Sequence, residues 1–84
     1  METLNTIRRL AVDTLNVPEE PLLRATTLRE AGIDSLSAVD LVFAVETHFG
    51  IVITGDELAR VRSLRDLAVV ADRLISRYPA HHAS

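Results

Sequence analysis

Ser35 has the clearest potential for covalent chemistry in this chain. Its hydroxyl directly follows Asp34, and His48 lies further along the same stretch, so the three residue types suggest a hydrolase triad. The turn that exposes a nucleophilic serine has the pattern Gly-x-Ser-x-Gly, whereas Ile33 and Ser37 occupy the glycine positions here. If one helix carries both Ser35 and His48, they lie about 20 Å apart. We therefore expect no catalytic activity from the chain itself.

Residues able to ligate a metal are few and poorly spaced. The sequence has no cysteine, which excludes a thiolate metal site, a disulfide and a cysteine nucleophile. The histidines are His48, His81 and His82, and adjacent histidines do not share a helical face as an i, i+4 pair does. Asp56 and Glu57 lack the ligand spacing of a calcium-binding loop. We therefore expect no metal site.

Length and charge narrow the class of protein further. Eighty-four residues, of which 48% are hydrophobic and 25% charged, predict one small globular domain over residues 1–84. A net charge of −3 argues against a nucleic-acid partner. No apolar run is long enough to span a bilayer, and no stretch resembles a secretory signal. The sequence predicts a cytoplasmic monomer that binds neither nucleic acid nor membrane.

The chain before Ser35 is predicted to form a helix and a long loop. Apolar residues at helical spacing predict an amphipathic helix over residues 3–15. Asn16 ends it, and Pro18 and Pro21 discourage its continuation. The connection over residues 16–34 is long for so small a domain, and such loops are often functional. Its apolar residues are expected to hold it to the core, namely Val17, Leu22, Leu23, Leu28 and Ile33.

Ser35 begins the second predicted helix, which runs to Phe49. Asp34 or Ser35 caps its start, and Gly50 ends it in a left-handed conformation. A short apolar loop packed on the core follows over residues 51–53.

Capping signals define the rest of the chain. Thr27 and Glu30 have the spacing of a capping box and predict a short helical turn within the long loop. A short helix is expected near residues 56–61, and Ser63 with Asp66 predicts the start of a last helix. Residues 79–84 lack apolar anchors and are expected to fray. The predicted fold is all-α, a small four-helix bundle of three principal helices plus one short helix, with a long first loop.

The helix after Ser35 carries two apolar stripes on a helical wheel. The core stripe consists of Ala38, Leu41, Val42, Val45 and Phe49. The second stripe consists of Leu36, Val39 and Phe43, at spacing i, i+3, i+7, and Asp40 and Glu46 edge it. We expect Leu36 and Phe43 to be exposed, whereas Val39 lies nearest the core and fits either environment. An exposed apolar stripe edged by carboxylates is typical of a surface that binds a protein partner transiently.

The run Gly32-Ile33-Asp34-Ser35-Leu36 has the form Gly-x-Asp-Ser-Leu at a loop-to-helix junction. Together with Val39-Asp40-Leu41-Val42, Glu46 and Phe49-Gly50-Ile51, it resembles the acyl carrier protein family. The resemblance covers nearly the whole chain, including the long first loop and the order of the helices. Asp-Ser-Leu alone occurs often by chance, so the specificity comes from this larger pattern.

The resemblance implies a function and a cofactor. Ser35 would receive 4′-phosphopantetheine from coenzyme A through a separate phosphopantetheinyl transferase. The arm would hold an acyl group as a thioester for an acyltransferase, a ketosynthase or another acyl-processing enzyme. The implied docking surface consists of Asp34, Leu36, Val39, Asp40, Phe43 and Glu46, extended by Asp56 and Glu57.

Departures from the family pattern bear on the pathway. Ser37, Thr47, His48 and Val52 stand where primary fatty-acid carriers often have acids, which favours a polyketide or other specialised pathway over fatty-acid synthesis. Peptidyl carriers more often have Gly-Gly before the Asp-Ser or His-Ser pair, whereas Gly32 and Ile33 precede Asp34 here, which favours acyl over aminoacyl cargo. A peptidyl or aminoacyl carrier is therefore the first alternative. The second alternative is a helical adaptor in which Ser35 is only a helix cap.

Overall fold

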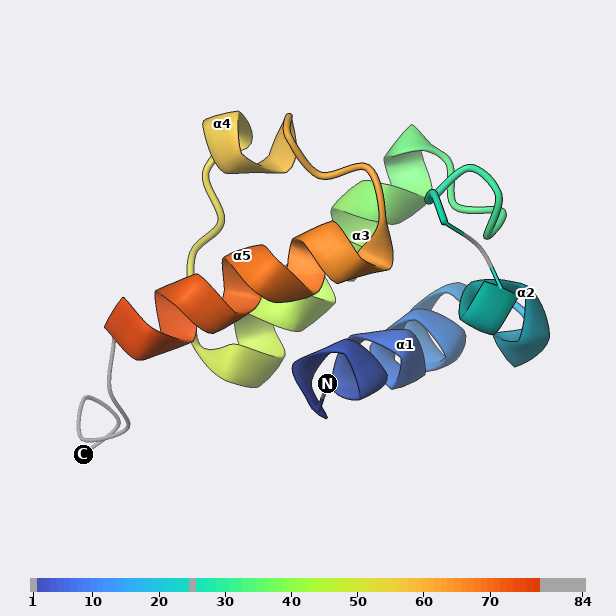
Figure 1. Cartoon of the computed structure of the whole chain (residues 1–84), viewed down its shortest axis with the longest axis horizontal. Helices are drawn as coiled ribbons and strands as arrows, with labels where there is room; N and C mark the ends of the chain where they lie inside the picture. The colour runs from blue at the N-terminus through green and yellow to red at the C-terminus, as the bar shows by residue number, and fades with distance from the viewer. Residues whose placement is uncertain (1, 25, 78–84) are drawn as a thin grey trace.

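The structure is a computed structural model that describes residues 2–24 and 26–77, and all regular structure within these ranges is helical. The helices are α1 (Glu2–Leu15), α2 (Glu19–Arg24), α3 (Ser35–Phe49), α4 (Gly55–Leu58) and α5 (Leu64–Arg77) (Figure 1). The predicted all-α fold is confirmed. The predicted tail, residues 79–84, lies outside the described residues, as do His81 and His82.

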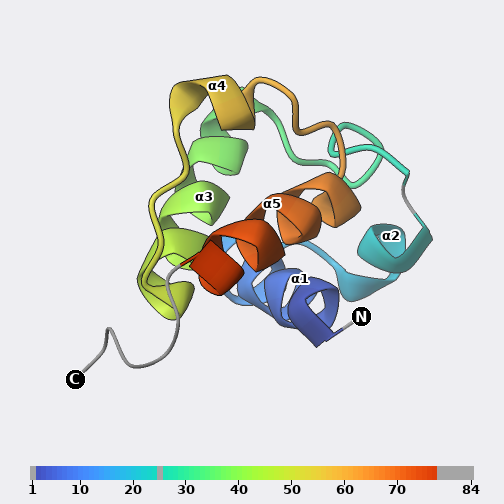
Figure 2. The same ribbon diagram turned by 60° about the vertical axis from the view of Figure 1, so that its left-hand side comes forward.

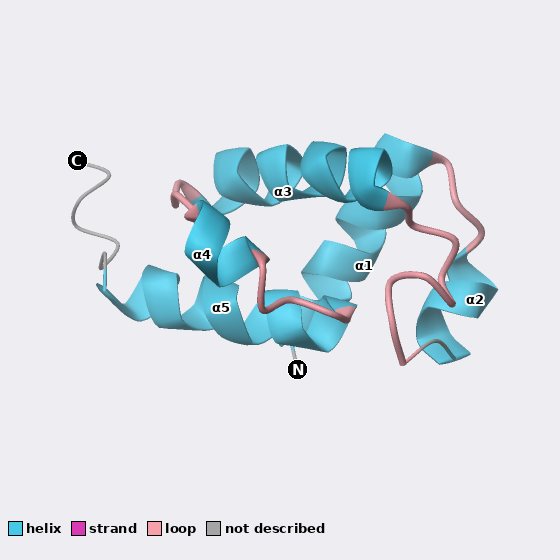
Figure 3. Ribbon diagram, turned by 90° about the horizontal axis from the view of Figure 1, so that it is seen from above, coloured by secondary structure: helices cyan, strands magenta, loops and turns pink. Residues whose placement is uncertain are grey.

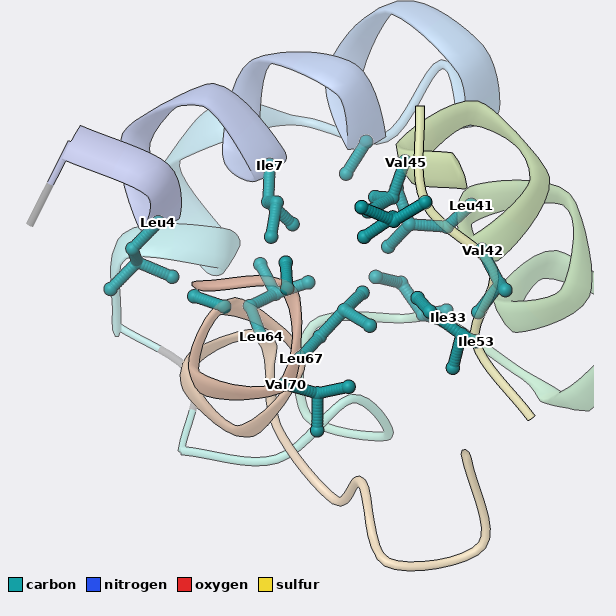
Figure 4. Close-up of a cluster of buried hydrophobic side chains, with 14 of the residues drawn as sticks. Leu4, Ile7, Ile33, Leu41, Val42, Val45, Ile53, Leu64, Leu67 and Val70 are labelled. Carbon is teal, nitrogen blue, oxygen red and sulfur yellow. The ribbon is translucent and has the colours of Figure 1, made fainter. Parts of the chain in front are cut away.

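The three long helices enclose the core. Helix α1 packs against both α3 and α5, and Figure 3 shows α1 crossing between these two helices. The largest fully buried side chains are Ile7 of α1, Leu41 and Val45 of α3, and Leu67 of α5 (Figure 4). The Thr3 hydroxyl also donates a hydrogen bond to the carboxylate of Asp72, which ties α1 to α5. The amphipathic faces predicted for these helices are the ones that meet in the core.

The predicted long loop contains a helix that the sequence analysis missed. Helix α2 includes Pro21, which was expected to discourage continuation of the first helix. Pro21 lies in the first turn, where a backbone N–H has no intrahelical acceptor and proline is tolerated. Leu22 of this helix is buried as expected, but the prediction was wrong for Leu23, whose side chain is 56% exposed. A helix this short presents one face to the core, and Leu22 occupies it.

The predicted turns and caps around α1 and α5 are present. Asn16 ends α1 with a positive φ of 55°, a conformation that asparagine tolerates better than most residues. Ser63 caps α5, since its Oγ accepts a hydrogen bond from the Asp66 N–H at 3.0 Å. Within the described residues, none of the five helices is both long and apolar enough to cross a bilayer.

The segment after α3 differs in detail from the prediction. Gly50 adopts the predicted left-handed conformation with φ 67°, and Ile51 and Ile53 are buried. The prediction was wrong for Val52, which is 71% exposed because alternate residues of an extended segment face opposite sides. Helix α4 begins earlier than predicted, because Thr54 and Glu57 form a capping box. It also ends sooner, at Leu58, where the backbone hydrogen bonds change to i→i−3 turns.

Candidate functional site

Ser35 is the first residue of α3, and the preceding residue, Asp34, is the N-cap of that helix. The Asp34 backbone is extended (φ −86°, ψ −176°), and its Oδ1 accepts a hydrogen bond from the Ser37 N–H at 2.8 Å. Ser35 itself is exposed, and no described residue forms a hydrogen bond with its hydroxyl. Because Asp34 satisfies the helix start, the Ser35 hydroxyl is left available for chemistry.

Hydrogen bonds and a buried side chain fix the loop before α3, and this loop positions Ser35. Glu30 and Thr27 bond to each other's backbone N–H, as their capping-box spacing predicted. Gly32 then turns the chain with φ 83°, a conformation in which a side chain is strained. Ile33 is buried, and Figure 4 shows it in the same part of the core as Leu41. The attachment of this loop to the core fixes where α3 begins and hence where Ser35 lies.

Hydrogen bonds favour the charged form of three carboxyl groups, one at the start of α3, one in the loop before it and one in α4. The Ser37 N–H lowers the pKa of Asp34, with a smaller contribution from the Ser37 hydroxyl. The Thr26 hydroxyl, followed by the Thr26 and Thr27 N–H groups, lowers the pKa of Glu30. The pKa of Glu57 is lowered chiefly by the Thr54 N–H. These bonds favour the ionised carboxylate, so the caps persist at pH values below the usual pKa range of carboxyl groups.

An open cleft of about 700 Å³ lies beside Ser35, between the start of α3, the loop before it, α4 and the segment leading to α5. We call it the Ser35 cleft. Its lining consists of Thr27, Leu28, Arg29, Ile33, Asp34, Ser35, Ala38, Val39, Leu58, Val61 and Arg62. The Leu28 N–H donates to the Arg62 carbonyl at 2.8 Å, so the two loops that form its walls are bonded together. The cleft is mainly apolar, with arginines in its wall.

The second apolar stripe of α3 lies on the surface. Leu36 is 80% exposed and Phe43 is 63% exposed, which confirms the exposure expected for both. Val39, for which either environment was open, is 44% exposed and also lines the Ser35 cleft. The segment 51–54 runs back along α3 toward α4 (Figure 2), and exposed Val52 lies on it. The exposed apolar stripe of α3 therefore begins beside Ser35.

Comparison with known proteins assigns the chain to a family. The family model described as "Phosphopantetheine attachment site" matches residues 5–69. An acyl carrier protein of Campylobacter hominis is 32% identical over 75 residues, covering 88% of this chain and 95% of the relative. Acyl carrier proteins of Petrotoga mobilis (33% identity, 77% and 78% coverage) and Zymomonas mobilis (31% identity, 84% and 92% coverage) are similar too. The chain belongs to the acyl carrier protein family. The cofactor of this family is covalently attached 4′-phosphopantetheine.

The acids of the expected docking surface fall into two groups in this carrier protein. Asp34 and Glu57 cap α3 and α4, and Glu46 Oε2 accepts a hydrogen bond from the Ile53 N–H at 2.7 Å. These carboxylates already have bonding partners within the fold. Asp40 and Asp56 are exposed, and no described residue bonds to their carboxylates. The sequence analysis offered Asp34 as a cap of this helix, but it did not predict the bond from Ile53 to Glu46, because a helical wheel shows no contact between a helix and the segment that follows it.

The geometry does not assemble the triad that the residue types suggested. Helix α3 is continuous from Ser35 to Phe49, which places Ser35 and His48 at its opposite ends. The His48 ring instead packs edge-on against Phe49, with ring centroids 4.8 Å apart. Within residues 2–24 and 26–77, no group of three or more His, Cys, Asp or Glu side chains could hold a metal ion.

Sequence reasoning missed several residues that lie close to the site. Val52 adds to the exposed apolar surface, and the alternation of Ile51, Val52 and Ile53 was the signal that could have identified it. Arg29 and Arg62 line the Ser35 cleft although neither belongs to the recognised motif. No local pattern links these two arginines, since the hydrogen bond between their loops joins segments far apart in the sequence.

Proposed function

We propose that this protein carries acyl groups as thioesters on a 4′-phosphopantetheine arm attached to Ser35. The observation that carries the proposal is the exposed Ser35 hydroxyl, which has no hydrogen-bond partner among the described residues, beside an Asp34 that caps the helix in its place. The adaptor alternative needs Ser35 as the cap, and Asp34 already fills that role. The family membership supports the same assignment.

The surroundings of Ser35 suit a phosphodiester on its oxygen. The first turn of α3 has backbone N–H groups without intrahelical acceptors, and the positive end of the helix dipole lies there. Arg29 lines both the Ser35 cleft and a smaller hollow formed with Gly32, Ile33, Asp34 and Ser35, so it adds positive charge nearby. Because no described residue bonds to the Ser35 hydroxyl, the base that accepts its proton comes from the phosphopantetheinyl transferase. When attached, the arm supplies the thiol that the chain lacks.

The surface beside Ser35 suits partners that bind and leave. Leu36, Val39 and Phe43 provide apolar contact, while Asp40 and Asp56 attract basic surfaces. Asp34, Glu46 and Glu57 support this surface through the hydrogen bonds that shape it. Acyltransferases, ketosynthases and other acyl-processing enzymes are the proposed partners, and they provide the catalytic groups. A polyketide or other specialised pathway is favoured by the non-acidic residues Ser37, Thr47, His48 and Val52.

A two-step loading experiment tests the carrier role. The chain is incubated with coenzyme A and a transferase, and then with acyl-coenzyme A and an acyltransferase. We expect an added acyl mass that hydroxylamine removes, because hydroxylamine cleaves thioesters. An added mass that resists hydroxylamine, or a correctly folded chain that never accepts an acyl group, would contradict the proposal.

A further inference from the structure

A second pocket, of about 360 Å³, lies between α1, α2 and the first turn of α5. We call it the arginine pocket, and Figure 2 shows these three elements next to one another. Its lining consists of Leu4, Arg8, Leu22, Leu23, Arg24, Thr26, Ser63, Leu64 and Arg65. None of these residues is acidic, three are arginines, and none of them lines the Ser35 cleft. A chain with a net charge of −3 therefore gathers positive charge at one hollow.

Arg8 has a hydrogen-bond donor that the fold leaves unused. Its Nε atom is buried and has no hydrogen-bond partner among the described residues. Its Nη1 donates to Asn5 Oδ1 at 3.1 Å, which anchors one end of the guanidinium group. Buried polar groups in proteins are nearly always paired, and an unpaired donor of a charged group costs free energy. Arg8 also lines the pocket, so a guanidinium with a donor that the described residues leave unpaired borders this hollow, an observation separate from the charge count.

The other charges around the pocket add to the positive potential. Arg65 is exposed in the first turn of α5, where helix N–H groups also favour an anion. Arg24 forms an exposed ion pair with Glu20 at 2.6 Å, and Glu30 bonds to the Thr26 hydroxyl at 2.6 Å. The carboxylates of Glu20 and Glu30 are therefore already bonded to Arg24 and Thr26. No described ion pair offsets the charge of Arg8 or Arg65.

We propose that the arginine pocket binds a phosphate group, with Arg8 and Arg65 as its principal ligands. A guanidinium presents planar, parallel N–H donors that match two phosphate oxygens, and arginine is charged at every physiological pH. The apolar wall formed by Leu4, Leu22 and Leu64 reduces water access, which strengthens such a contact. The volume exceeds that of inorganic phosphate and leaves room for a small phosphomonoester.

The test uses the full chain, isotope-labelled, and follows the arginine Nε–H signals by NMR. Inorganic phosphate is titrated in one arm and phenyl phosphate in the other, against sodium chloride at matched ionic strength. We expect a saturable shift of the Arg8 Nε–H signal with phosphate and none with chloride. Tighter binding of phenyl phosphate would identify an organic phosphate as the better ligand, and equal binding would identify the phosphate group alone.

Variants decide whether these arginines make the site. Arg8→Met and Arg65→Met should each weaken phosphate binding by about tenfold, the effect of one charge-assisted hydrogen bond. Arg9→Met, at an exposed neighbour on α1 outside the pocket, is the matched control and should change it less than about twofold. If Arg8→Met does not fold, Arg65→Met carries the test, because Arg65 is exposed. Unsaturable shifts that chloride reproduces, or an unchanged phosphate affinity in Arg65→Met, would overturn the proposal.

Discussion

The hydrogen bond between Glu46 and Ile53 leads to a prediction that distinguishes a role of Glu46 in folding from a role in partner docking. Glu46 Oε2 accepts from the Ile53 N–H at 2.7 Å in a partly buried position, while the Glu46 carbonyl accepts from the N–H groups of Gly50 and Ile51. The side chain thus holds the returning segment 51–54 against α3. Replacing Glu46 by alanine removes that bond but leaves the backbone bonds in place.

The expected cost follows from the kind of bond that is lost. A hydrogen bond to a charged group contributes about 1.5–3 kcal/mol, and the partial exposure here lowers this to about 1–2 kcal/mol because water replaces the lost acceptor. For a chain of 84 residues, each kcal/mol lowers the melting temperature by about 4–8 °C. Glu46→Ala should therefore melt roughly 4–15 °C below the parent chain. Glu46→Gln keeps an acceptor oxygen and should lose less than half as much.

Asp40→Ala is the matched control, since Asp40 is an exposed acid on the same helix whose carboxylate no described residue contacts. It should change the unfolding free energy by less than about 0.5 kcal/mol. Thermal unfolding followed by circular dichroism at pH 7 measures all three variants. Equal melting temperatures for Glu46→Ala and Asp40→Ala would refute the reasoning and return Glu46 to the set of freely available docking charges.

Three further predictions concern other parts of the same surface. Phe43→Glu should lower the rate of acyl transfer to a partner enzyme by about tenfold, the effect of one lost apolar anchor, with little change in melting temperature; a collapse of the melting temperature would instead place Phe43 in the core. Gly50→Ala should cost about 1 kcal/mol in urea unfolding, because the added Cβ has open space but the φ of 67° strains it; an unchanged midpoint would show that this backbone relaxes freely. The lowered pKa values of Asp34, Glu30 and Glu57 give stability that is present above the ordinary carboxyl pKa range and is lost as the pH falls through their lowered values. Melting temperature should therefore be level from pH 7 to about 5 and fall below about 4, less steeply in Asp34→Asn, and an acid profile identical in that variant would exclude Asp34 as a contributor.

Local sequence signals predicted most of the fold because they act over a few residues. The apolar spacing of α1, α3 and α5, the left-handed ends at Asn16 and Gly50, and the Ser63 cap all follow from contacts within one or two turns. Helix α2 escaped prediction because residues 16–34 were interpreted as one long connection, although Pro21 lies in the first turn of this short helix, where proline is tolerated.

The site was less predictable wherever it depends on distant segments. The Asp34-Ser35 junction and the exposure of Leu36 and Phe43 could be read from the motif and the helical wheel. The bond from Ile53 to Glu46 joins α3 to the segment after it, and the bond from Leu28 to Arg62 joins two separate loops, so no spacing rule indicates either bond. The unused Nε–H of Arg8 likewise appears only once α1 is packed against its neighbours.

The most direct test of the account is the intact mass of three chains after incubation with coenzyme A and a phosphopantetheinyl transferase. The parent chain and Ser37→Ala, a control that removes the next serine on the same helix, should each gain one phosphopantetheine group. Ser35→Ala should fold normally and gain none. A gain in Ser35→Ala, or the absence of any gain in a folded parent chain, would contradict the central claim that Ser35 is the attachment site.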